Sequence, residues 1–125
     1  MTDVTFGDFV KSRRANKRIS LRAFSERIGM DPSNYSRMER GVDPPPSHLH
    51  KLHAIARSLD IAIQSEEYRE MERLADIGRG DIPRAILSNE QLAGKLPAFF
   101  RTLDREAMDE EAMDRLIETV RKEFE

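Results

Sequence analysis

The segment from residue 19 to residue 41 constrains the fold of this chain most, because it encodes two short helices joined by a sharp turn. Ser20 is a good helix N-cap, and apolar residues follow it at helical spacing. Gly29 stands where this first helix must end, since glycine readily adopts the positive φ that a sharp turn needs. The pattern therefore predicts a helix over residues 21–28 that is followed at once by a turn.

A second helix is predicted from Pro32 to about Arg40, and Gly41 ends it. Asp31 offers a side-chain cap, and a proline in the first turn costs no hydrogen bond, because its N–H would have no helical partner there. The face that the helical period turns toward the core carries Tyr35, Met38 and Glu39. The outer face carries short polar groups and guanidinium groups, namely Ser33, Asn34, Ser36, Arg37 and Arg40.

The two helices resemble the helix-turn-helix of the phage lambda repressor and Cro superfamily, often called the XRE family. The residues that match the family pattern in register are Ser20, Phe24, Gly29, Ser36, Arg37, Glu39, Arg40 and Gly41. The resemblance implies an all-α fold, in which a five-helix lambda-repressor-like helix-turn-helix domain over residues 1–64 precedes a small helical C-terminal module over residues 65–125. The pattern alone leaves open a plain corner of two helices in a protein that does not bind DNA.

In this family the second helix of the pair lies in the major groove of DNA. By position, the residues that would read bases are Ser33, Asn34, Ser36 and Arg37. An Asn side chain suits adenine and an Arg side chain suits guanine, and each good bidentate pair contributes about 1–3 kcal/mol of discrimination. The residues predicted to hold phosphate groups are Lys17, Arg18, Ser20, Arg22 and Arg40.

Two further positions follow from the resemblance. The family often has Gln directly after the capping residue, where it contacts a phosphate; this chain has Leu21 there, so that contact is either lost or supplied by neighbours such as Arg22. Relatives also pair an arginine of the first helix with the glutamate that ends the recognition helix, and Arg14 and Glu39 hold these positions. Such a pair would fix the recognition helix against the first helix. The alternative is an ordinary surface ion pair.

Three more helices complete the predicted first domain and begin the second. The first helix of the chain covers about residues 5–16, and its apolar face carries Phe6, Phe9, Val10 and Ala15. After three consecutive prolines, Ser47 is predicted to cap a helix over residues 48–59, whose apolar stripe carries Leu49, Leu52, Ile55, Ala56 and Leu59. A fifth helix follows its cap Ser65 up to residue 77, and one of its faces carries Tyr68, Met71, Leu74 and Ala75.

The C-terminal module is predicted to contain short helical segments with an uncovered apolar face. Ser88 and Gln91 have capping-box spacing for a helix through about Gly94, Pro97 opens another helical turn, and Asp109 begins the final helix. The predicted dimer or partner face carries Phe99, Phe100, Met113, Leu116, Ile117, Val120 and Phe124. This apolar set must pack on the fifth helix, on a second copy or on another protein.

The tail also looks like the C-terminal extension of a subset of XRE-type regulators, on the basis of Ile82-Pro83 and the run from Leu96 to Arg101. Such regulators are often encoded beside a zinc metallopeptidase of the ImmA/IrrE type or beside a toxin. The resemblance therefore implies one of these proteins as a partner, whereas the other interpretation of the tail is a purely structural extension.

Charge is divided unevenly along the chain. Residues 1–64 hold 11 Lys and Arg against 7 Asp and Glu, a net charge of +4, whereas residues 65–125 hold 10 against 16, a net charge of −6. A basic first part suits contact with DNA, and an acidic second part suits contact with protein.

Other classes of protein find little support. The chain has no cysteine, no apolar run of about 18 residues and no basic-then-apolar N-terminus, so a cytoplasmic protein without a membrane span is expected. It has no glycine-rich phosphate loop and no HExxH motif, so neither an enzyme activity nor a cofactor is expected. Three histidines lie between residues 48 and 53, but a metal site would need further ligands, so no metal is expected.

The sequence thus predicts a sequence-specific DNA-binding transcription regulator. We expect a homodimer that represses its own operon through a palindromic operator in double-stranded DNA. Two alternatives remain at this stage: an antitoxin whose acidic half neutralises a toxin while its basic half autoregulates, and a protein-interaction module that does not bind DNA. The residue Leu21, in place of Gln, is the one feature that favours the last alternative.

Overall fold

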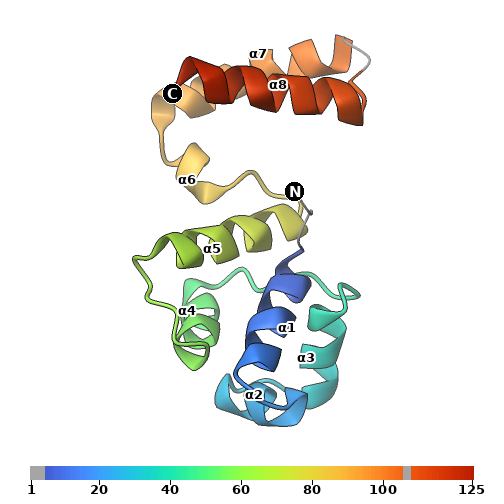
Figure 1. The fold of residues 1–125 in the computed structure, drawn as a ribbon, viewed down its shortest axis with the longest axis vertical. Helices are drawn as coiled ribbons and strands as arrows, with labels where there is room; N and C mark the ends of the chain where they lie inside the picture. The colour runs from blue at the N-terminus through green and yellow to red at the C-terminus, as the bar shows by residue number, and fades with distance from the viewer. Residues whose placement is uncertain (1–4, 106–107) are drawn as a thin grey trace. The chain divides into compact units, whose positions relative to one another are not determined.

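A computed structural model describes residues 5–105 and 108–125 of the chain. All the regular elements in this part of the chain are helices, with no strand, which confirms the predicted all-α class. Its helices are α1 (Phe6–Asn16), α2 (Leu21–Arg27), α3 (Pro32–Glu39), α4 (Leu49–Ser58), α5 (Glu66–Gly78), α6 (Arg84–Leu87), α7 (Glu90–Arg105) and α8 (Glu110–Glu123) (Figure 1). The chain divides into two compact units, Met1–Ala85 and Ile86–Glu125.

Side-chain caps begin four of the first five helices. Thr5, Ser20, Asp31 and Ser65 each accept a hydrogen bond from a backbone N–H in the first turn of α1, α2, α3 and α5. The prediction that Ser47 caps α4 is wrong, because His48 is the N-cap residue and makes no side-chain capping bond. The three prolines hold this segment in an extended path up to His48, so the helix begins one residue later than the polar signal indicates.

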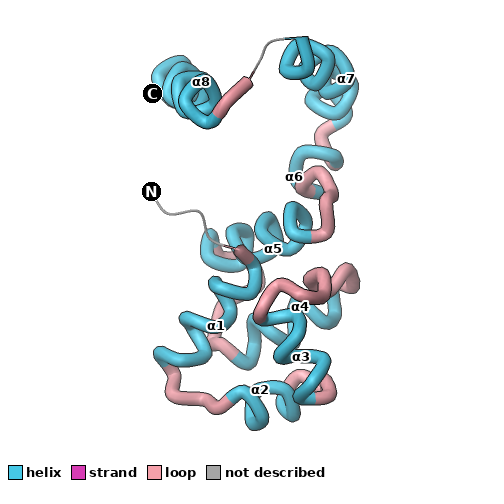
Figure 2. Tube along the Cα trace, turned by 90° about the vertical axis from the view of Figure 1, so that its right-hand side faces the viewer, coloured by secondary structure: helices cyan, strands magenta, loops and turns pink. Residues whose placement is uncertain are grey.

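The core of the first unit lies among α1 to α5. α1 packs against α3 and α5, and α2 packs against α3 and α4 (Figures 1 and 2). The buried apolar residues are Phe6, Phe9, Val10, Phe24, Tyr35, Met38, Leu52, Ile55, Ala56, Leu59, Ile61, Tyr68, Met71 and Ala75. Two predicted core positions are wrong: Ala15 and Leu49 are exposed, because each lies in a terminal turn that the neighbouring helices do not cover.

The boundary between the units differs from the predicted boundary after residue 64. α5 belongs to the first unit, because its side chains Tyr68, Met71 and Ala75 are buried in the same core as those of α1. Without α5, core side chains of α1 would be exposed to solvent. The division therefore falls after Ala85.

A buried carboxylate extends the first unit beyond α5. Asp76 is 1% exposed and accepts hydrogen bonds from Arg79 Nη2 at 2.6 Å, Arg84 Nη2 at 2.7 Å and the Arg84 backbone N–H at 2.9 Å. Arg79 also donates from Nη1 to the carbonyl oxygen of Pro46 at 2.6 Å. Burial alone would raise the pKa of Asp76, but the hydrogen bonds from Arg84 and Arg79 outweigh it, so this pKa is lowered. The network ties residues 79–84 to the end of α5 and to the α3–α4 loop.

In the second unit, two predictions about α7 are wrong. Asn89 rather than Ser88 caps this helix, since its side-chain oxygen accepts from the backbone N–H groups of Gln91 and Leu92. The helix also runs through Gly94 and Pro97 without a break. A proline costs one helical hydrogen bond, and the surrounding residues, which are mostly good helix formers, carry the helix past it.

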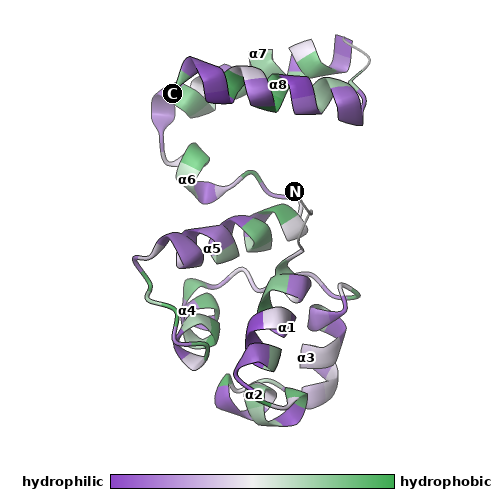
Figure 3. Cartoon of the chain, viewed as in Figure 1, coloured by the Kyte–Doolittle hydropathy of each residue, from purple (hydrophilic) through white to green (hydrophobic). Residues whose placement is uncertain are grey.

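The helices of the second unit are strongly amphipathic and little covered. Figure 3 shows hydrophobic and hydrophilic residues along both α7 and α8. None of the described residues between 86 and 125 is buried. The predicted partner face is exposed at Phe99, Phe100, Met113, Ile117, Val120 and Phe124 and half-buried at Leu116.

Candidate nucleic-acid interface

The outer face of α3 carries most of the residues predicted to read bases. Ser33, Asn34 and Arg37 are exposed, and Ser36 is half-buried. Ser33, Ser36 and Arg37 line one shallow depression of about 390 Å³, together with Pro32 and Arg40. Asn34 instead borders a separate depression. The outer face of α3 thus has two parts: Ser33, Ser36 and Arg37 lie on one side with Arg40, and Asn34 lies on the other.

Asp31 satisfies the first N–H groups of α3. Its Oδ2 accepts from the backbone N–H of Ser33 at 2.9 Å and from that of Asn34 at 3.3 Å. The side chains of Ser33 and Asn34 take no part in this cap, so it fixes their backbone and leaves their polar groups facing outward.

An almost buried ion pair holds α3 against α1. Arg14 donates from Nε to Glu39 Oε2 at 3.0 Å and from Nη2 to Glu39 Oε1 at 2.7 Å. Their side chains are 13% and 4% exposed. The Tyr35 hydroxyl donates to Glu39 Oε2, and Arg14 Nη1 donates to the Ile19 carbonyl oxygen at 2.9 Å. The structure thus brings together the pair that the family resemblance implied, and adds Tyr35 to it.

The network shifts the pKa values of Arg14 and Tyr35. The hydrogen bond to Glu39 is the largest cause that raises the pKa of Arg14 above its usual value. Burial raises the pKa of Tyr35 well above its usual value, and the hydrogen bond to the Glu39 carboxylate raises it further. Tyr35 therefore remains a neutral hydrogen-bond donor to Glu39 at neutral pH.

Arg37 is held by an aspartate from the loop after α3. Its Nε donates to Asp43 Oδ2 at 3.0 Å, and its Nη2 donates to Asp43 Oδ1 at 3.1 Å. The hydrogen bond from Arg37 is the largest cause that lowers the pKa of Asp43. Sequence reasoning missed Asp43, because its only sequence signal is an acidic residue after the helix-ending Gly41.

The residues predicted to contact phosphate occupy different settings. Arg18, Arg22 and Arg40 are exposed, and Arg40 Nε donates to Ser36 Oγ at 3.3 Å. Ser20 Oγ accepts from the Ala23 backbone N–H at 3.1 Å as the cap of α2, so its own O–H stays free to donate. Lys17 is already paired, since its Nζ lies 2.6 Å from Asp60 Oδ2.

Leu21, the departure from the family pattern, has a packing role. It is half-buried and lies against the hydrophobic core of the first unit. A leucine at this position exchanges a phosphate contact for burial of apolar surface, which stabilises the fold. Its presence therefore has a structural reason and does not by itself argue against DNA binding.

Three cations near the predicted site escaped sequence reasoning. Lys51, from α4, lines the same depression as Asn34. Arg27 and Arg57 line another depression of about 470 Å³ with Lys17 and Asp60. These residues come from α2 and α4 and meet only through the fold, so the sequence carries no local signal for them.

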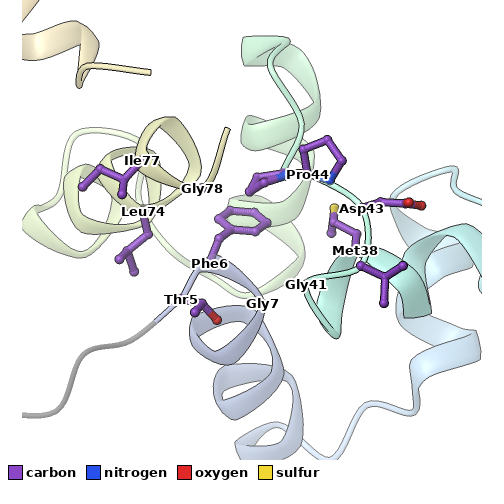
Figure 4. Close-up of a pocket in the computed structure, with 12 residues that line it drawn as sticks. Thr5, Phe6, Gly7, Met38, Gly41, Asp43, Pro44, Leu74, Ile77 and Gly78 are labelled. Atoms are coloured by element: carbon purple, nitrogen blue, oxygen red, sulfur yellow. The ribbon is translucent and has the colours of Figure 1, made fainter. Parts of the chain in front are cut away.

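A fourth depression, of about 430 Å³, lies where the start of α1, the α3–α4 loop and α5 meet (Figure 4). Its apolar lining comes from α1, α3, the loop after α3 and α5, and Asp43 also lines it. Gly7 also lines it, at the point where α1 approaches the end of α3. The loop that carries Asp43 therefore lies between α3 and α5.

Neither a membrane span nor a metal cluster is found in the part of the chain that the structure describes. None of the described helices combines the length and the apolar character that crossing a bilayer requires. No group of three or more His, Cys, Asp or Glu side chains could hold a metal ion within the same residues.

The comparison with known protein families agrees with this geometry. Residues 5–66 match a family described as a helix-turn-helix domain, and the match covers α1 to α4 up to the first residue of α5. No curated protein and no solved structure matches the chain. The sharp turn at Gly29, the capped α3 and the exposed polar face of α3 are the features by which such a domain reads DNA. Residues 5–66 of this chain therefore form a helix-turn-helix domain.

Proposed function

We propose that this chain is a sequence-specific DNA-binding transcription regulator of the XRE type, with α3 in the major groove. The observation that carries the proposal is the division of α3 into two faces. Ser33, Asn34 and Arg37 are exposed, whereas Tyr35 and Met38 are buried in the core. An exposed face of hydrogen-bonding groups on a rigidly seated helix is what reading base edges requires.

The network of Arg14, Glu39 and Tyr35 supports this role. It fixes the C-terminal end of α3 against α1 with two bonds from one guanidinium and one from a phenol. A helix that reads bases must keep its position relative to the groups that hold the DNA backbone, because a shift of one ångström would break bidentate contacts.

In this proposal, the cationic side chains around α3 contact the phosphate groups of the DNA. Arg18, Arg22 and Arg40 are exposed, and the planar guanidinium group of arginine matches the geometry of phosphate oxygens. Lys51 extends this set on the side of Asn34. Lys17 would contact a phosphate only by exchanging its partner Asp60, so we assign it a smaller share of the binding energy.

We further propose that the protein acts as a homodimer on a palindromic operator and represses its own operon. Two reading heads on B-DNA must stand about one helical turn, ~34 Å, apart, and a two-fold symmetric dimer meets that requirement. The exposed apolar residues of α7 and α8 support self-association, since such a stripe is stabilised when it is covered.

The substitution Arg37→Ala tests base reading directly. We expect the affinity for the DNA upstream of the protein's own gene to fall by about 1–3 kcal/mol, and the preference at one base pair to relax. Fluorescence anisotropy at several salt concentrations, on this DNA and on a scrambled duplex, measures both effects. Arg69→Ala is the matched control, because Arg69 is an exposed arginine on α5 with a helical ion-pair partner, Glu66.

Two results would contradict the proposal. An equal loss for every DNA sequence would make Arg37 a phosphate contact only. Failure of the unaltered protein to bind any DNA at low salt, where the attraction to phosphate is strongest, would remove the DNA-binding function itself.

A further inference from the structure

The exposed face of α8 has the spacing of a coiled-coil seam. Met113, Ile117, Val120 and Phe124 follow one another at intervals of four, three and four residues. They are 38%, 41%, 50% and 84% exposed. Alternating steps of three and four residues place side chains on one stripe of a helix, where they can insert between those of a facing helix. The stripe covers twelve residues, a little less than two heptads, and this spacing defines a register with one partner helix.

Charge is polarised along α8. Asp109, Glu110, Glu111 and Asp114 give its N-terminal end a strong negative charge, whereas Arg121 and Lys122 balance Glu123 and Glu125 at its C-terminal end. Two parallel copies would place the acidic ends together, where they repel. Two antiparallel copies would instead place each acidic end beside the end that carries Arg121 and Lys122.

We propose that α8 pairs with the α8 of a second copy in antiparallel orientation. In the register that matches the two seams, Ile117 of one copy faces Val120 of the other, and Met113 faces Phe124. This register also puts Asp114 beside Arg121 on the edge of the seam, twice by symmetry. The proposal rests on the homodimer part of the proposed function and is independent of how α3 reads DNA.

Disulfide trapping tests the orientation, because the chain has no cysteine of its own. We would prepare the full chain as Met113→Cys and as Phe124→Cys, one of them with a tag that changes its mass, mix them and oxidise gently. The antiparallel pair predicts a mixed disulfide between the two variants. The antiparallel pair disfavours a disulfide between two Met113→Cys copies. Position 113 of one copy would lie about 16 Å from position 113 of the other along the helix axis, beyond the reach of a disulfide.

Charge exchange gives a second readout. Asp114→Arg alone and Arg121→Asp alone should each raise the dimer dissociation constant about tenfold in sedimentation equilibrium, and the double exchange should restore it. Arg115→Asp is the control, because Arg115 lies outside the seam and its edges in this register.

Mainly homodimeric disulfides at Met113→Cys would overturn the antiparallel register, and a monomer at every concentration would overturn the pairing. A monomer that still prefers its operator would leave the DNA-reading part of the proposed function intact. Dimers with antiparallel disulfides but without DNA binding would overturn only that part.

A different observation concerns Asp43. The aspartate holds Arg37 by the edge formed by Nε and Nη2, which leaves Nη1 directed elsewhere. The backbone N–H groups of Val42 and Asp43 both donate to the Arg37 carbonyl oxygen, at 2.8 Å and 3.2 Å, so the loop is anchored to the residue whose side chain it holds. Gly41 allows this return with a φ of 79°.

We infer that Asp43 is a positioning residue that sets base specificity through Arg37, an inference that rests on the proposed function of α3. A guanidinium held along one edge keeps its end-on N–H groups for the O6 and N7 of guanine, and it loses less side-chain freedom on binding. The same carboxylate repels the phosphates of any DNA, so it disfavours binding that lacks the correct base contact.

The variant Asp43→Ala separates these effects. We expect affinity for scrambled DNA to rise several-fold, while discrimination at the base pair identified with Arg37→Ala falls about five- to tenfold. Asp81→Ala is the matched control, since Asp81 is also an aspartate of the first unit paired with an arginine, Arg79, and neither residue belongs to the predicted DNA contacts.

If the discrimination between base pairs is unchanged in Asp43→Ala, Asp43 acts only by repelling phosphates. If this discrimination increases, Asp43 hinders base contact by Arg37. Either result overturns the inference. If Arg37→Ala itself changes no base preference, the proposed function of α3 fails first, and the two failures are thereby distinguished.

Discussion

Replacing Glu39 with Ala is expected to lower the free energy of unfolding of the first unit by about 3–5 kcal/mol. The Glu39 side chain is 4% exposed and accepts hydrogen bonds from Arg14 and Tyr35. Without it, the Arg14 guanidinium is left almost buried with no carboxylate to compensate its charge, and the Tyr35 hydroxyl loses its acceptor. Urea denaturation followed by circular dichroism measures the change.

The matched control for Glu39 is Glu67→Ala. Glu67 also pairs with an arginine of α1, with Arg13 at 3.2 Å, but its side chain is 47% exposed. A solvent-exposed pair contributes about 0–1 kcal/mol, so this variant should unfold almost like the original. A Glu39→Ala protein that unfolds at the same urea concentration as the Glu67→Ala protein would show that the buried network is not needed for stability.

Gly7→Ala is expected to destabilise the first unit by roughly 3 kcal/mol, the upper end of the usual cost of overpacking. A Cβ atom at Gly7 would lie 2.1 Å from the carbonyl oxygen of Glu39 and 2.8 Å from its carbonyl carbon. Both atoms belong to the backbone at the end of α3, so no side chain can turn away. α1 and α3 would have to separate, which would also strain the pair of Arg14 and Glu39.

The chain offers a matched control for this substitution as well. Gly94 lies inside α7, and a Cβ atom there would meet nothing within 4 Å. Because alanine favours a helix more than glycine by up to about 1 kcal/mol, Gly94→Ala should be neutral or stabilising for α7. Thermal unfolding of both variants measures the contrast. Equal melting temperatures for Gly7→Ala and the unaltered protein would contradict the close approach of the two helices.

Much of the first unit could be predicted because its signals are local. The caps Thr5, Ser20, Asp31 and Ser65 act on N–H groups two or three residues away, and Gly29 and Gly41 adopt positive φ where a helix ends. The apolar period of α3 also acts locally, since it decides which side chains share a face. Interactions within one helical turn can be read without knowledge of the fold.

Local signals failed where a neighbouring preference outweighed them. Pro97 does not break α7, because one lost hydrogen bond is less costly than ending a helix whose other residues favour it. Ala15 and Leu49 have the correct period for the core but lie in end turns that no other helix covers. A period shows which face an apolar residue shares, and only the neighbours decide whether that face is covered.

By itself, the sequence determined the helical class, the turn at Gly29, the capped helix α3 and the exposed polar residues of that helix, because each depends on spacing along one or two helical turns. The tertiary structure alone decided that Asp43 forms an ion pair with Arg37 and that Asp60 forms one with Lys17. It also decided that α5 belongs to the first unit and that Gly7 must have no side chain. Contacts between helices depend on where the chain returns in space, and no spacing in the sequence encodes that position.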